Sequence, residues 1–195
     1  MSRWLRLEEI LCHPQRGPAV AAALRTPAAV VLAPWIGPGM DRLLRLSLSA
    51  HQPMPTLATG GDIATVATRA LRPVARGDCL PDPAAGGIVT RRWFILPQRD
   101  APELIEITTR AWEGFEADTP GRPLGLWQDM APTPDGAAQI MLLTCYPSLA
   151  AWESSRAFRP GAAQGPARRG EWAALFARRR ALLLDSWVEV WGVAA

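Results

Sequence analysis

The sequence predicts an α+β fold of two similar halves, each an antiparallel sheet with helices on one face. Three observations predict it. Strand-like and helix-like segments alternate along the second half, the tripeptide Pro-Gln-Arg follows an apolar strand pattern at both 14–16 and 97–99, and a stretch rich in Pro and Gly separates the halves. We therefore expect a first repeat at 1–78, a linker at 79–87 and a second repeat at 88–195.

The first half is the thinner copy. Apolar patterns at 5–12 and 42–49 predict strands, and a helix has to fit between Gly17 and Arg25. The closing strand of this half is expected at 66–74. The helix that should precede that strand is expected to be short or missing.

The second half opens with a strand at 88–96, which is rich in β-branched and aromatic residues. A helix is predicted to follow at Asp100. Pro102 is tolerated in its first turn, and Asp100 with Glu103 approximates a capping box. Helical spacing predicts one buried stripe, formed by Leu104, Ile105, Thr108, Ala111, Trp112 and Phe115.

A hairpin comes next, with strands at 124–130 and 139–146 joined by a Thr-Pro-Asp-Gly turn at 133–136. Ser148 is expected to cap a helix that runs to Phe158, and a further helix is expected at 168–184. Strict alternation at 186–192 predicts a last strand. The order β-α-β-β-α-α-β is the split pattern of a ferredoxin-like unit with one extra helix.

Helices on one face leave the other face of each sheet in need of a partner. The other half of the chain is the nearest one. We therefore expect two tandem ferredoxin-like repeats that pack sheet to sheet as a barrel-like pseudo-dimer. The space enclosed between the sheets is predicted to hold the functional site.

Composition narrows the function classes. All 21 basic residues are Arg, as codon bias in a GC-rich bacterial genome would produce, and the net charge of +3 argues against nucleic acid as a partner. Three cysteines without C-x-x-C spacing favour a reducing compartment, so we expect a cytoplasmic protein. Arg25, Pro27 and Pro34 interrupt the longest apolar stretch, and no membrane segment is expected.

Candidate ligand-binding residues follow from strand alternation. Arg91 shares a strand face with Trp93, and Arg6 shares one with Glu8. Both sets are expected to face the interior, where an Arg91–Glu8 pair would orient a polar ligand or tie together two buried charges. Trp93 and Trp127 would stack on a flat ligand or fill the core.

Other polar residues carry weaker signals. His13 and His51 are the only imidazoles, and neither lies at ligand spacing from further ligands, so we expect no metal and no cofactor. The positive cluster at 178–180, with Arg168 and Arg169, is interpreted as a solvated helix face rather than an anion site. Arg178 and Arg180 are expected to point outward, and Arg179 is expected near the edge of the buried stripe of that helix.

Parts of the chain resemble the NIPSNAP family, namely 86–97, Gly125-Leu126-Trp127, 146–150, Glu171-Trp172 and 180–183. The resemblance implies a dimeric α/β-barrel fold with two copies in tandem. It also implies kinship with haem-degrading and cofactor-independent monooxygenases. Two positions depart from the family pattern: 89–93 keeps one Arg of Glu-x-Arg-x-Tyr, and Leu142 and Arg45 stand where a His is frequent on the hairpin strand.

The expected function is binding of a small apolar or aromatic molecule between the sheets. Arg91 would hold an anionic group, Trp93 and Trp127 would enclose the rest, and Glu8 or His51 would supply a base. A noncatalytic protein-interaction module and a cofactor-independent monooxygenase-like enzyme are the alternatives. A third interpretation is a structural subunit that pairs with a second copy as a homodimer.

Overall fold

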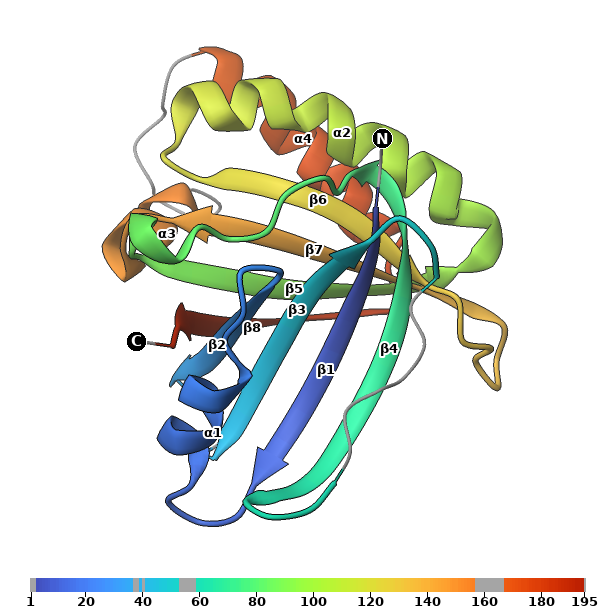
Figure 1. Ribbon diagram of the computed structural model, residues 1–195. Coiled ribbons are helices and arrows are strands. Elements are labelled where there is room, and N and C mark those ends of the chain that lie inside the picture. The colour runs from blue at the N-terminus through green and yellow to red at the C-terminus, as the bar shows by residue number, and fades with distance from the viewer. Residues whose placement is uncertain (1–2, 37–38, 40, 53–58, 157–166, 195) are drawn as a thin grey trace.

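Eight strands close into a barrel in the computed structural model, which describes all residues except 1–2, 37–38, 40, 53–58, 157–166 and 195 (Figure 1). The strands are β1 (Trp4–Cys12), β2 (Ala29–Ile36), β3 (Arg42–Ser49), β4 (Ile63–Arg76), β5 (Ile88–Pro97), β6 (Arg122–Asp129), β7 (Ala137–Tyr146) and β8 (Asp185–Val193). Neighbouring strands are antiparallel throughout. The expected α+β fold with antiparallel sheets is confirmed.

The order around the barrel is β1-β3-β2-β8-β5-β7-β6-β4. Strands β1–β4 are therefore neighbours, and so are β5–β8. Within each group the fourth strand lies beside the first, the first beside the third and the third beside the second, which is the ferredoxin-like order. The barrel closes where β2 pairs with β8 and where β4 pairs with β6.

The helices lie outside the barrel (Figure 1). They are α1 (Gly17–Leu24), α2 (Ala101–Asp118), α3 (Leu149–Ser155) and α4 (Ala167–Ala181), with short 3-10 turns at Pro83–Ala85 and Gln98–Asp100. Leu104 and Ile107 of α2 pack on Phe94 and Leu96 of β5. Within the described ranges, none of the helices is long and apolar enough to span a bilayer.

Apolar side chains fill most of the barrel interior. Every strand contributes to this core, through Leu5, Leu7, Val30, Leu32, Leu44, Leu46, Leu71, Val89, Trp93, Leu124, Trp127, Met141, Leu143 and Trp191. The predicted chamber between the sheets is therefore wrong for the middle of the barrel, because large residues occupy that space. A hollow remains toward one end, around Arg91.

Several predicted elements are confirmed. The turn at 133–136 forms, with the Gly136 N–H donating to the Thr133 carbonyl at 3.1 Å and a Gly136 φ of 68° that favours glycine. Ser148 caps α3 by accepting from the Ala151 N–H at 3.1 Å. The continuation of that helix toward Phe158 lies outside the described residues.

Other expectations need correction. Asp100 makes no side-chain cap bond, and Glu103 pairs instead with Arg178 at 2.6 Å, so the capping box is wrong. The closing strand of the first half is longer than expected, because β4 also reaches across to pair with β6. Helix α4 ends at Ala181, since β8 begins soon after. The described residues between β3 and β4 form no helix.

Candidate functional site

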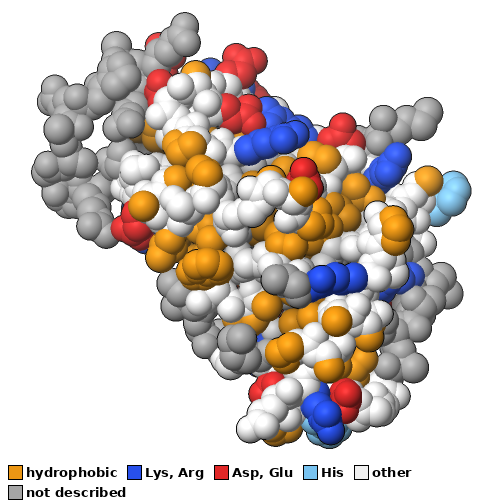
Figure 2. Space-filling model, turned by 60° about the vertical axis from the view of Figure 1, so that its left-hand side comes forward, with side chains coloured by type: hydrophobic (Ala, Val, Ile, Leu, Met, Phe, Trp, Pro, Cys, Tyr) orange, Lys and Arg blue, Asp and Glu red, His pale blue; other side chains and the backbone are white. Residues whose placement is uncertain are grey.

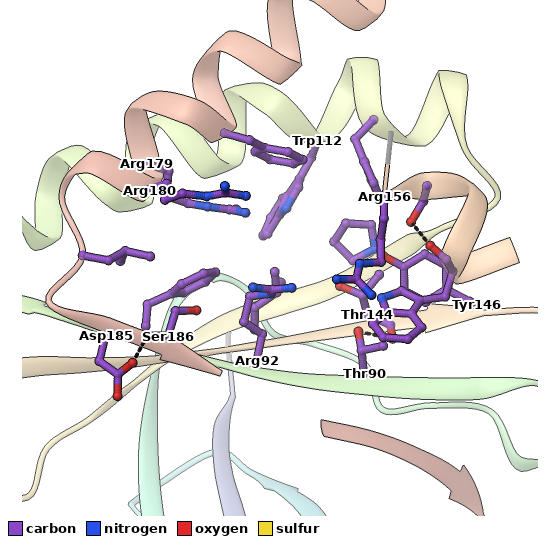
Figure 3. A pocket seen from close by; sticks show the side chains of 18 residues that line it. Thr90, Arg92, Trp112, Thr144, Tyr146, Arg156, Arg179, Arg180, Asp185 and Ser186 are labelled. Atoms are coloured by element: carbon purple, nitrogen blue, oxygen red, sulfur yellow. Dashed lines mark hydrogen bonds between the residues drawn. The ribbon is translucent and has the colours of Figure 1, made fainter. Parts of the chain in front are cut away.

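One cavity lies outside the barrel, between the outer face of the second-half sheet and its helices (Figure 3). Its volume is about 650 Å³. The lining residues are Thr90, Arg92, Phe94, Trp112, Phe115, Pro123, Leu142, Thr144, Tyr146, Trp152, Ser155, Arg156, Phe176, Arg179, Arg180, Leu183, Asp185 and Ser186. We call this cavity the arginine pocket, because four arginines and a single carboxylate line it.

Arg92 stands on the floor of the arginine pocket. Alternation along β5 turns Arg91 and Trp93 into the barrel and Arg92 toward the helices. The Arg92 side chain is half-buried and forms no ion pair with any described carboxylate. Burial lowers the pKa of Arg92, and the positive charges of Arg156 and Arg180 lower it further.

Arg179 and Arg180 reach the pocket from α4. The Arg179 guanidinium lies over the rings of Phe176 and Phe94, at 4.2 and 4.7 Å from their centroids. Burial, together with Arg92 and Arg180, lowers the pKa of Arg179 to about 9. Arg179 thus lies at the edge of the buried stripe, as expected, and is part-buried. Arg178 lies on the solvated face, where it pairs with Glu103.

Hydroxyl groups gather at the other end of the pocket (Figure 3). The Tyr146 hydroxyl is hydrogen-bonded to Ser155, and burial raises the pKa of Tyr146. Thr90 donates to the Thr144 carbonyl at 3.3 Å. Arg156 flanks this end, where it pairs with Glu153 at 3.2 Å and lies over the Trp152 ring. This end offers neutral hydrogen-bonding groups beside a cation.

The only carboxylate among the lining residues is Asp185 at the edge, and its Oδ1 accepts from the Ser186 N–H at 2.7 Å. Aromatic rings supply flat apolar walls, from Phe94, Trp112, Phe115, Trp152 and Phe176. Together they make a positively charged cleft with flat apolar walls. Such a cleft suits a planar molecule that carries a negative charge.

The predicted Arg91–Glu8 pair does not form. Arg91 lies inside the barrel, as expected, where it pairs with Glu9 and Glu189 at 2.6 Å each. Glu8 is fully buried on the opposite face of β1 and pairs with Arg45 at 2.7 Å. Glu8 cannot reach Arg91 because it lies on the outer face of β1. Ile10 packs on α1 outside the barrel, and alternation along the strand places Glu8 and Arg6 on the same face as Ile10.

The remaining predicted residues are scattered. Trp93 and Trp127 lie within the barrel core at 3% and 0% exposure, and the Trp127 Nε1 donates to the Arg3 carbonyl at 3.4 Å. His51 is exposed beyond the end of β3. The structure thus brings Arg91, Trp93 and Trp127 into one interior and leaves Arg6, Glu8 and His51 outside it. Ligand binding by these residues stays a prediction.

Sequence reasoning missed Arg92, although a signal was present. The alternation that turns Arg91 inward turns its neighbour outward, onto the face that carries the helices. An arginine on that face, with no acidic residue near it in the sequence, is the signal that indicates an anion site between the sheet and its helices. Among the described residues, no three His, Cys, Asp or Glu side chains lie close enough together to hold a metal ion.

No protein-family model matches the chain, and a search of curated proteins finds no match. Solved structures do match. An anthrone oxidase-like protein aligns over 100% of this chain and 92% of its own, with a TM-score of 0.63 and 11% identity. The chain has the same fold.

Two structures from Listeria monocytogenes extend the comparison. A ferredoxin-fold protein related to antibiotic biosynthesis monooxygenases aligns over 97% of this chain and 94% of its own, with a TM-score of 0.52 and 13% identity. A heme-degrading enzyme aligns over 97% and 99%, with a TM-score of 0.52 and 12% identity. The neighbours are thus ferredoxin-fold, monooxygenase-like proteins, and at these identities the likeness concerns the fold alone.

Proposed function

We propose that the chain binds a planar aromatic anion in the arginine pocket. The observation that carries the proposal is Arg92, a half-buried cation that faces Arg179 and Arg180 with no described carboxylate paired to it. Holding these positive charges together costs free energy. A bound anion offsets the cost at Arg92, because no described carboxylate is paired to that guanidinium.

The aromatic walls specify the rest of the ligand. Six aromatic side chains, Tyr146 among them, line a cavity of about 650 Å³, a size within the usual range for small-molecule sites. The names of two structural neighbours refer to anthrone and heme, which are flat polycyclic molecules. For heme itself the lining is a poor match, because it contains no His, Cys or Met, and Tyr146 alone would be left as an iron ligand.

The test is calorimetric titration with anthraquinone-2-carboxylate and with its neutral analogue 2-(hydroxymethyl)anthraquinone. The carboxylate is expected to bind more tightly. Arg92→Gln is expected to weaken carboxylate binding by about 10- to 100-fold, the loss of one charge-assisted hydrogen bond. Arg110→Gln, on the exposed face of α2, is the matched control and should change nothing. Equal binding by wild type and Arg92→Gln contradicts the proposal.

The same proposal covers the organisation of the chain. We infer a tandem pair of ferredoxin-like units, as in the NIPSNAP family, with boundaries at 1–78, 79–87 and 88–195. The identical strand order in the two halves supports it. A cytoplasmic location agrees with cysteine usage. A chain that binds neither anthraquinone would instead favour the noncatalytic interaction module.

Oxygenation is the second candidate function, and the arginine cluster favours it. An anthrone loses a proton from its methylene group to give an electron-rich anion, and a pocket of positive charge stabilises that anion. The anion can react with dioxygen directly, so that anthrone and O₂ give anthraquinone and water. The measurement is oxygen uptake with anthrone. Uptake that depends on Arg92 supports an enzyme, and uptake no faster than without protein contradicts it.

A further inference from the structure

A second cavity of about 500 Å³ opens into one end of the barrel. Strand β8 pairs with β5 from Asp185 to Gly192 but with β2 only from Val190 onward, so among the described residues Glu189 has no partner on β2. The lining residues are Glu9, Ile10, Leu11, Pro34, Arg42, Leu43, Leu44, Thr65, Ala67, Arg91, Trp152, Val188, Glu189, Val190 and Trp191. We call it the barrel-end cavity.

In this cavity the guanidinium of Arg91 forms ion pairs with two carboxylates. Arg91, 5% exposed, donates to Glu9 Oε1 and to Glu189 Oε2 at 2.6 Å each. Trp191 also donates to Glu189 Oε2, at 3.3 Å. The second oxygen of each carboxylate accepts no hydrogen bond from a described residue, and the two side chains are 36% and 34% exposed. The group therefore carries one surplus negative charge, with two free acceptor oxygens.

The surroundings of this group are largely apolar. Leu11, Leu44 and Ala67 line the cavity, as do Pro34 and the ring of Trp191. Figure 2 shows hydrophobic side chains gathered in patches over the face that carries β2 and α3, with single charged groups between them.

Arg42 also lines the cavity, but its side chain is exposed. Solvent therefore screens the charge of Arg42 more strongly than that of Arg91, which is 5% exposed.

We propose that the barrel-end cavity binds an amine with an apolar body. Its ammonium group donates to the free oxygens of Glu9 and Glu189, and its body lies on Leu11, Leu44 and Trp191. The preferred charge is opposite to that of the arginine pocket. Trp152 lines both cavities, but the charged groups of each cavity are different residues, so each proposal can fail without the other.

The test compares three ligands of similar size, 2-phenylethylamine, 2-phenylethanol and 3-phenylpropionate, by calorimetric titration of the full chain. The amine is expected to bind at least about tenfold more tightly than the alcohol, and the carboxylate more weakly than either, because only the amine supplies a charge-assisted hydrogen bond. Equal affinity for amine and alcohol, or no amine binding at millimolar concentration, overturns the proposal.

Glu9→Gln separates ligand binding from a structural role. Glutamine keeps an acceptor for Arg91 but removes the surplus charge, so amine affinity should fall about tenfold while alcohol affinity stays the same. Glu106→Gln, on the exposed surface of α2, is the control. Binding of anthraquinone-2-carboxylate should be unchanged in Glu9→Gln. If that variant does not fold, Glu189→Gln carries the same comparison, and unchanged amine affinity in the folded variant contradicts the proposal.

Discussion

Arg179 makes anion binding depend on pH. Its pKa is lowered to about 9, so it is charged at pH 7 and loses its proton as the pH rises through 9. A bound anion favours the charged form, and binding must therefore weaken with rising pH across that range. We expect the affinity for anthraquinone-2-carboxylate to fall between pH 8 and pH 10, as measured by titration at fixed ionic strength.

The control for this prediction is Arg179→Gln, which should bind more weakly at pH 7 and show a flat profile from pH 8 to pH 10. Burial raises the pKa of Tyr146, so its phenol loses its proton at higher pH than an exposed tyrosine does. A variant with the same slope as the wild type would assign the pH dependence to another group.

Two adjacent glycines at the start of β5 differ in what a side chain would meet. A Cβ on Gly87 would lie 2.2 Å from the Tyr146 carbonyl oxygen, whereas one on Gly86 would meet nothing within 4 Å. Both have positive φ. Gly86→Ala should therefore cost only the backbone strain of about 1 kcal/mol. Gly87→Ala should cost clearly more in urea unfolding, and equal costs would refute the contact argument.

At the residue scale, the face of β5 could be predicted from sequence and the face of β1 could not. Arg91, Trp93 and their neighbours alternate so regularly that their common face follows from strand geometry. On β1 both faces are apolar, Leu5 and Leu7 on one and Ile10 on the other. Only the position of α1 decides between them, so the sequence alone predicts Glu8 in the interior, where the structure has Glu9.

At the element scale, the packing of α4 on α2 builds the roof of the arginine pocket. Trp172 of α4 is buried, meets Phe115 edge to face at 5.6 Å and donates to Asp118 at 2.9 Å. Gly114 of α2 lies beneath it, where a Cβ would stand 2.9 Å from the indole Cδ1. The two helices approach closely because residue 114 has no side chain.

Gly114→Val should therefore push α4 away from α2. We expect a lower midpoint of thermal unfolding and weaker binding of anthraquinone-2-carboxylate, because Arg179 and Arg180 move with the helix. Ala117→Val places the same side chain on the exposed face of α2 and should alter binding little. If Gly114→Val loses stability but binds normally, the position of α4 does not set the pocket.

The sequence predicts those features of an element that depend on neighbouring residues, and it misses those that depend on residues far away in the chain. Periodicity predicts α2 and most of its buried stripe, because neighbours in the sequence decide each position. The exception is Ile105, which is only partly buried, whereas Ile107 is buried. The capping box failed because Glu103 finds a stronger partner in Arg178, 75 residues away. The sequence does not predict the arginine pocket for the same reason. Its charged residues come from β5, α3 and α4, and only the packing of the sheet and helices brings them together.

At the scale of the whole molecule, the two halves are joined by more than the linker. Strand pairs β2–β8 and β4–β6 cross between them, and Arg91 of the second half pairs with Glu9 of the first. The shared core contains Leu5 and Leu7 together with Trp93 and Trp127. Residues 82–86 of the linker are exposed, and the only regular structure there is the short turn Pro83–Ala85.

Cutting the linker should therefore leave the barrel intact. We expect a chain with a protease recognition sequence inserted between Ala84 and Ala85 to be cleaved completely and still to elute as one species on size exclusion, because hydrogen bonds and apolar contacts hold both pieces. The pieces should separate only in denaturant. An uncut chain with the same insertion is the control, and separation in native buffer would show that the two halves are independent domains and that the closed barrel is not their stable form.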